Sequence, residues 1–106
     1  MFHVKHRLFV RTELTVDGAG TAIHVAELEP VENGFCRMLR IIELDPNSAI
    51  TGAAREGRTA GMANEPNALV PHPDTYDQFP DITARHLNEE EFEGLWTEAT
   101  TLFPEL

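Results

Sequence analysis

Residues 8–53 repeat one pattern, an alternating β-forming segment followed by a short turn, and this pattern constrains the fold more than any other feature. In LFVRTELTV, at residues 8–16, apolar and polar side chains alternate as they do in a half-buried strand. TAIHVAELE, at residues 21–29, indicates a second strand, and the Asp-Gly pair between them supplies the positive φ of a hairpin turn. We therefore expect neighbouring antiparallel strands.

The most apolar segment is FCRMLRIIEL, at residues 35–44. Apolar side chains occupy both phases of its alternation, which favours a central strand covered on both faces, although a short helix would have the same apolar density. Strict alternation assigns one face to Cys36, Met38, Ile42 and Leu44, and the other to Phe35, Leu39 and Ile41. The turn DPNS and the following AITGA predict a returning strand.

A helix is expected to begin after Leu87, because Asn88 can cap it and Glu91 completes a capping box. Leu87 and Phe92 have the spacing of a hydrophobic staple, and Pro104 ends the helix. Helical spacing places six apolar residues on the inward face: Phe92, Leu95, Trp96, Ala99, Leu102 and Phe103.

These elements predict one α+β domain over residues 1–106, an antiparallel meander of three to five strands with the C-terminal helix packed on one face. Residues 52–81 lose all periodicity and are rich in Gly and Pro, which predicts a long loop.

The opening hexapeptide MFHVKH, residues 1–6, is expected to be an extension that the fold does not need. One set of codons for it, ATG TTT CAC GTG AAA CAT, is an inverted repeat that resembles the centromere-like site of a bacterial chromosome-partition protein. The alternative is an extension of the first strand.

The charge balance narrows the range of partners, because 18 acidic residues against 8 basic ones give a net charge of −10. Such a surface repels nucleic acid and anionic membranes, whereas it suits a basic protein partner and also favours solubility. No apolar run approaches the roughly 20 residues of a membrane span, and the single cysteine, Cys36, fits a reducing cytoplasm. A homodimer is compatible with this composition.

No residue pattern indicates catalysis, a metal or a cofactor. Ser48 is the one serine and lies in a turn signal, while Cys36 lies in the most apolar segment. The carboxylates of residues 89–93 are expected to be solvated, and the five histidines have no ligand spacing. The basic sequence REGR, at residues 55–58, is too short to predict a binding patch.

The best candidate for a recognition surface is PDTYDQFPD, residues 73–81, which places two aromatic rings among acidic residues. The candidate binding residues are Asp74, Tyr76, Asp77 and Phe79. The competing interpretation, which we favour, is that the two rings anchor the loop to the core.

Two segments resemble a small bacterial family of unknown function, the DUF6881-like domains. GFCRMLRIIELDPNSAITGA is similar to that family's strand-turn-strand, and ITARHLNEEEFEGLWTEA is similar to its closing strand and helix. The residues that match the closing motif are Glu90, Glu91, Phe92, Glu93 and Trp96. The resemblance implies a binding role, in the neighbourhood of bacterial toxin-immunity systems, and it carries no catalytic residues.

The sequence therefore predicts a non-catalytic, immunity-like interaction domain whose acidic surface binds another protein. The alternative is a small-molecule-binding or enzymatic domain with a pocket under residues 52–81.

Overall fold

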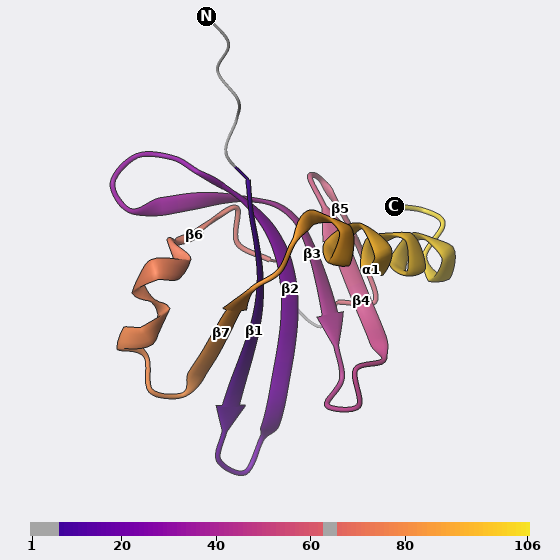
Figure 1. The fold of residues 1–106 in the computed structure, drawn as a ribbon. Helices are drawn as coiled ribbons and strands as arrows, with labels where there is room; N and C mark the ends of the chain where they lie inside the picture. The colour runs from indigo at the N-terminus through magenta and orange to yellow at the C-terminus, as the bar shows by residue number, and fades with distance from the viewer. Residues whose placement is uncertain (1–6, 63–65) are drawn as a thin grey trace, which may run out of the picture.

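A computed structural model describes residues 7–62 and 66–106; the extension at residues 1–6 lies outside the described residues. These described residues form seven strands, one 3₁₀-helix and one α-helix. Their arrangement is shown in Figure 1. The first four strands are β1 (Leu8–Val16), β2 (Gly20–Pro30), β3 (Phe35–Leu44) and β4 (Ile50–Arg55). They are followed by β5 (Arg58–Ala60), β6 (Leu69–Pro71), the 3₁₀-helix η1 (Pro73–Gln78), β7 (Ile82–His86) and α1 (Glu89–Leu102).

The strands form one antiparallel sheet in the order β5-β4-β3-β2-β1-β7, with β6 paired to β3 beyond the end of β4. The meander of β1 to β4 confirms the predicted α+β architecture. The expectation of three to five strands was wrong, since residues 7–62 and 66–106 already form a sheet of seven. Residues 52–81 are correspondingly not one long loop, because they contain the end of β4, the whole of β5 and β6, and η1. These added strands have three residues each, too few for an alternating pattern to show.

A β-bulge in β3 changes which side chains of this strand share a face of the sheet. Glu27 pairs with Arg40 and Leu28 with Met38, so that Leu39 is the extra residue. Beyond this residue the alternation is shifted by one position. Ile41 therefore joins the buried cluster of Cys36 and Met38, and the predicted grouping of these two with Ile42 and Leu44 was wrong.

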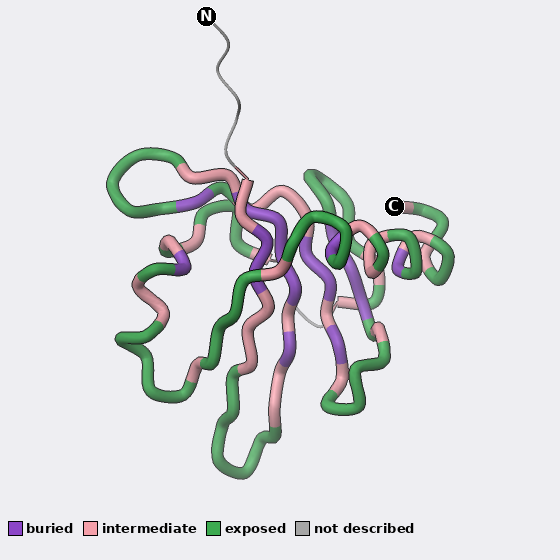
Figure 2. The backbone as a smooth tube through the Cα atoms, in the orientation of Figure 1, coloured by how far each residue is buried: buried purple, intermediate pink, exposed green. Residues whose placement is uncertain are grey.

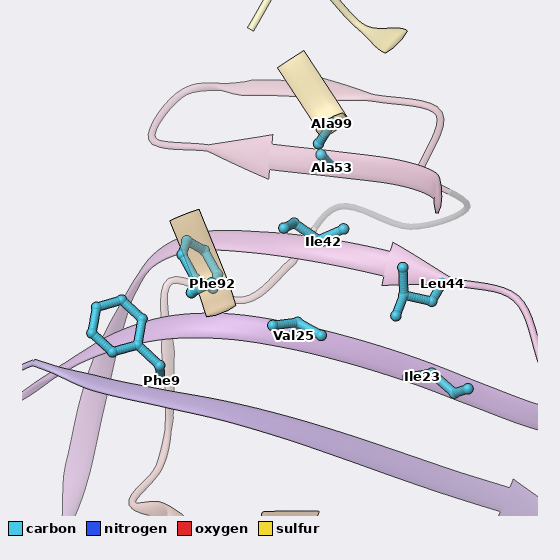
Figure 3. Packing of buried hydrophobic residues seen from close by; sticks show 8 residues of the cluster. All are labelled: Phe9, Ile23, Val25, Ile42, Leu44, Ala53, Phe92 and Ala99. Atoms are coloured by element: carbon cyan, nitrogen blue, oxygen red, sulfur yellow. The ribbon is translucent and has the colours of Figure 1, made fainter. Parts of the chain in front are cut away.

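The helix α1 covers one face of the sheet (Figure 1). Its capping box is present, because Glu91 N–H donates to Asn88 Oδ1 at 2.8 Å and Asn88 N–H donates to Glu91 Oε1 at 3.3 Å. Phe92 and Ala99 are fully buried against the sheet (Figure 3). Together with these two residues, the first cluster contains Phe9, Ile23, Val25, Ile42, Leu44 and Ala53.

Of the six residues expected on the inward face of the helix, only Phe92 and Ala99 are buried, and Leu95 and Phe103 are partly buried. Trp96 is only partly buried, although it stacks on Phe92 with ring centroids 6.4 Å apart. Leu102, the last residue of α1, is 58% exposed.

The opposite face of the sheet carries a second buried cluster: Val10, Ala26, Leu28, Cys36, Ile41 and Ala54. Met62 and Val70, from the segments on either side of residues 63–65, pack against it. The chain after β6 then reaches β7 at the far side of β1 through η1. This crossing brings η1 and β7 together at one margin of the sheet.

Candidate functional site

The marginal strand β7 has one row of backbone groups that β1 does not use. Hydrogen bonds near both ends of the strand fix its orientation: Leu87 N–H donates to the Phe9 carbonyl at 2.8 Å, and Thr15 N–H donates to the Asp81 carbonyl at 3.2 Å. Backbone hydrogen bonding alternates along an antiparallel strand, so the odd-numbered residues of this segment direct their N–H and C=O groups toward β1. The even-numbered residues direct their backbone groups away from the sheet.

Ala84 and His86 are the residues whose N–H and C=O groups are open to a partner. Within residues 7–62 and 66–106 no hydrogen bond occupies these groups, whereas the N–H of Ile82 already donates to the Phe79 carbonyl at 3.1 Å. Nearly the whole of β7 is exposed (Figure 2). An unpaired strand edge of this kind is a template for one more strand.

Carboxylates stand at both ends of this open edge. They are Asp77 and Asp81 before the strand, and Glu89, Glu90 and Glu91 after it. Each is exposed, and none forms an ion pair with another residue of the described chain. The strand itself contributes one permanent cation, Arg85. The β7 edge, defined here as Ile82–His86 with these five flanking carboxylates, is therefore an acidic surface.

The four residues expected to form a recognition surface all lie on η1 or directly after it. Asp74 and Asp77 are exposed, and Phe79 is 45% exposed beside the start of β7. Tyr76 is half-buried. Its burial is the main cause that raises the pKa of its hydroxyl, and the nearby Cys36 is a smaller one. Asp77 and Phe79 thus adjoin the β7 edge, while Tyr76 is turned partly toward the body; their binding role stays a prediction.

The connection between β7 and α1 holds the second acidic flank in place. Asn88 follows the strand after a single residue and caps α1, so Glu89, Glu90 and Glu91 form its first turn. Carboxylates are favoured there by the helix dipole. The flank is therefore fixed relative to the strand.

The groups considered for nucleophilic chemistry have surroundings that suit structural roles. Cys36 is fully buried, and burial, with a further contribution from the Asp74 carboxylate, raises the pKa of its thiol. A buried thiol that stays protonated is a poor nucleophile. Ser48 occupies a turn with a φ of 70°.

Other features of residues 7–62 and 66–106 also bear on function. No three His, Cys, Asp or Glu side chains in them gather as metal ligands. None of their helices has the length and apolar character needed to cross a membrane. A pocket of about 260 Å³ lies between β3, the β4–β5 hairpin and residues 66–68.

Comparisons of the chain with protein-family models, with curated proteins and with solved structures found no match. The resemblance to the DUF6881-like domains accordingly stays a prediction. Asp77 and Phe79, which were predicted from the sequence, adjoin this candidate edge, and their binding role is untested. Ala84 and His86 were not predicted, because the availability of a backbone group depends on the sheet order and leaves no trace in the side-chain pattern.

Proposed function

We propose that this chain is a non-catalytic protein-interaction domain that binds an extended segment of another protein along the β7 edge. The observation that supports this proposal is the open backbone of Ala84 and His86 on an exposed marginal strand. Strand addition supplies affinity through main-chain hydrogen bonds and specificity through alternate side chains. The half-exposed Phe79 offers an apolar contact at one end.

The proposed partner segment is basic. The flanking carboxylates stand at both ends of β7, on a chain with a net charge of −10. Complementary charge speeds encounter and selects among partners. A second copy of this chain is a poor occupant, because antiparallel pairing of two β7 edges would bring Glu89–Glu91 of one copy beside Asp77 and Asp81 of the other.

The resemblance to the DUF6881-like domains favours the same class of function, since that family implies binding without catalysis. An immunity-like protein of the bacterial cytoplasm fits the acidic surface and the single, buried cysteine. A basic toxin domain is then the class of partner to seek.

The experiment begins with a photo-crosslinking amino acid at Thr83, which is exposed on β7, and at Asp17, which is exposed in the β1–β2 turn, as a control. Proteins captured from Thr83 and absent from Asp17 are candidate partners. Capture identifies a partner but does not by itself support the proposal.

Binding of the identified partner is then measured for the wild type, for Ala84→Pro and for Ala84→Thr. Proline removes the outward N–H, whereas threonine keeps it and suits a strand. We expect Ala84→Pro to weaken binding at least about tenfold and Ala84→Thr to bind like the wild type. Equal binding by both variants would show that β7 does not accept a strand. The association rate should also fall with added salt.

A further inference from the structure

The side chains of β7 alternate between the two faces of the sheet, so a strand bound along the β7 edge would meet two different surfaces. Thr83 and Arg85 lie on the face that α1 covers, because their pairing through β1 aligns them with Ile23 and Val25 of the first cluster. The other residues of β7 lie on the opposite face: Ile82, Ala84 and His86. Alternate side chains of a bound strand are what such an edge can select.

On the face that α1 covers, Arg85 is an exposed cation without an ion pair in the described chain. It stands directly opposite Arg11 of β1, and Arg11 Nη1 donates to Glu13 Oε1 at 2.6 Å. Like charges directly opposite each other destabilise a sheet, whereas opposite charges stabilise it. On the open side of β7, a carboxylate of a bound strand would supply the charge that complements Arg85.

On the opposite face, a row of apolar side chains crosses the sheet and ends at β7. Ala22 of β2, Leu14 of β1 and Ile82 of β7 are directly paired neighbours. Leu14 is 38% exposed and Ile82 is only partly buried, so the row is in contact with water. An apolar side chain placed opposite Ile82 would lengthen the row and remove apolar surface from water.

The direction of the sheet sets the order of these two contacts along a bound strand. All strand pairs of the described sheet are antiparallel. A bound strand that continues this arrangement runs from the His86 end of β7 to the Ile82 end. It therefore meets Arg85 first and Ile82 three positions later. An odd separation changes the face of a strand, so the two contacts lie on the two different surfaces.

We propose that the segment bound along β7 carries an acidic residue facing Arg85 and, three positions later, an apolar residue facing Ile82. Its basic residues lie beyond these positions, beside the carboxylates at the two ends of the edge. This inference rests on the proposed function of the β7 edge and names the sequence that the edge selects. It also gives the pairing a register, because a slip of one residue would move both side chains to the wrong face.

The test selects short random peptides, displayed on phage, that bind the immobilised full chain. Enriched peptides are synthesised, and their dissociation constants are measured for the wild type, for Ala84→Pro and for Ala84→Thr. Peptides that bind at least about tenfold more weakly to the proline variant, and equally to the threonine variant, bind by strand addition. We expect these peptides to share an acidic residue followed three positions later by an apolar one.

A charge reversal tests whether Arg85 selects the acidic residue. Arg85→Glu should weaken binding of an enriched peptide at least about twofold, and replacing the acidic residue of the peptide by lysine should restore it. Arg55→Glu changes the net charge equally on β4, far from β7 in the strand order, and is the matched control. It should bind the original peptide like the wild type. Equal changes with the two variants would contradict the pairing with Arg85.

The apolar contact is tested by repeating the selection on Ile82→Thr. Threonine keeps a β-branched residue in the strand but replaces an apolar end of the row by a hydroxyl group. The backbone hydrogen bond from Ile82 to the Phe79 carbonyl does not depend on the side chain. We expect peptides selected on this variant to keep the acidic residue and to lose the apolar preference. An undiminished apolar preference would contradict the contact with Ile82.

The failure of this inference can be told apart from the failure of the proposed function. If no peptide is enriched, or if enriched peptides bind Ala84→Pro as well as the wild type, β7 does not accept a strand and both proposals are wrong. If the peptides depend on the Ala84 N–H but lack the acidic and apolar pair, or carry it in the reverse order, the proposed function stands and the inferred selection is wrong.

Discussion

Arg40 of β3 holds Glu93 of α1 through two hydrogen bonds, from Nη1 to Oε1 at 3.0 Å and from Nη2 to Oε2 at 2.7 Å. Its Nε donates to Glu27 of β2, and its guanidinium carbon lies 4.8 Å from the ring centroid of Phe92. Burial opposes the charge of Arg40, yet the hydrogen bonds with Glu93 and Glu27 outweigh it and raise the pKa of the guanidinium. One side chain thus joins two strands to the first half of α1, the helix that carries the second acidic flank of β7.

The first prediction concerns this contact. Glu93→Gln should lower the free energy of unfolding by about 0.5–1 kcal/mol at neutral pH, a modest value because the Glu93 side chain is 46% exposed and water screens the pair. The hydrogen bond with Arg40 lowers the pKa of Glu93. The stabilisation is therefore complete above the unfolded carboxyl pKa of about 4.3 and is lost as the pH falls through the lower folded value.

Urea unfolding at neutral pH and at about pH 3 measures the effect. Glu98→Gln, on an exposed part of α1 without an ion pair in the described chain, is the control and should change little. A difference between wild type and Glu93→Gln that stayed constant across this pH range would contradict the prediction.

The second prediction concerns the orientation of β7. Thr83→Pro should lower the melting temperature by several degrees, because it removes an N–H that donates to β1 and with it a hydrogen bond of the sheet. Ala84→Pro should cost much less, since its N–H points away from the sheet, where edge strands accept proline. Thermal unfolding of both variants measures the difference. The opposite order of stability would mean that Ala84 faces β1, and that the proposed binding edge has been assigned to the wrong residues.

The elements that could be predicted from the sequence are those marked by patterns of residues close together in the chain. The bounds of β1 and β3 agree with the predicted segments, and the cap at Asn88 was expected in full. Each of these rests on alternation over many residues or on a hydrogen-bonding motif within one turn. Such signals are carried by the side chains themselves.

The features that were missed depend on contacts far apart in the chain. The bulge at Leu39 lies where β3 pairs with β2 on one side and changes its partner from β6 to β4 on the other. The like-charged residues Arg55 and Arg58 are brought opposite each other only by the pairing of β4 with β5. Neither relationship can be deduced from the order of the residues.

The third prediction compares the two aromatic residues at the start of α1. Phe92→Ala should lower the free energy of unfolding by about 3–5 kcal/mol, because Phe92 is fully buried in the first cluster. Trp96→Ala should cost less, about 1–3 kcal/mol, because part of its ring is already in water. Urea unfolding monitored by circular dichroism measures both variants. Fluorescence would not serve, because Trp96→Ala removes the one tryptophan of the chain. A larger loss for Trp96→Ala would show that α1 packs through its second turn rather than through Phe92.

The fourth prediction concerns the close approach of β4 to the chain after β5. A Cβ atom at Gly52 would lie 2.7 Å from the carbonyl carbon of Gly61 and 2.8 Å from the nitrogen of Met62. These are backbone atoms that cannot rotate away, so Gly52→Ala should lower the free energy of unfolding by about 1–3 kcal/mol. The matched control is Gly94→Ala, on the exposed side of α1, where a Cβ atom meets nothing within 4 Å. That substitution should stabilise the fold by about 0.5–1 kcal/mol, because alanine favours a helix.

Urea unfolding of the two alanine variants should therefore give shifts of opposite sign. Because the close approach at Gly52 and Gly61 fixes the hairpin that carries Arg55 and Arg58, Gly52→Ala should also displace the amide signals of residues 54–59. A Gly52→Ala protein as stable as the wild type, with those signals unmoved, would show that the segment after β5 does not press against β4.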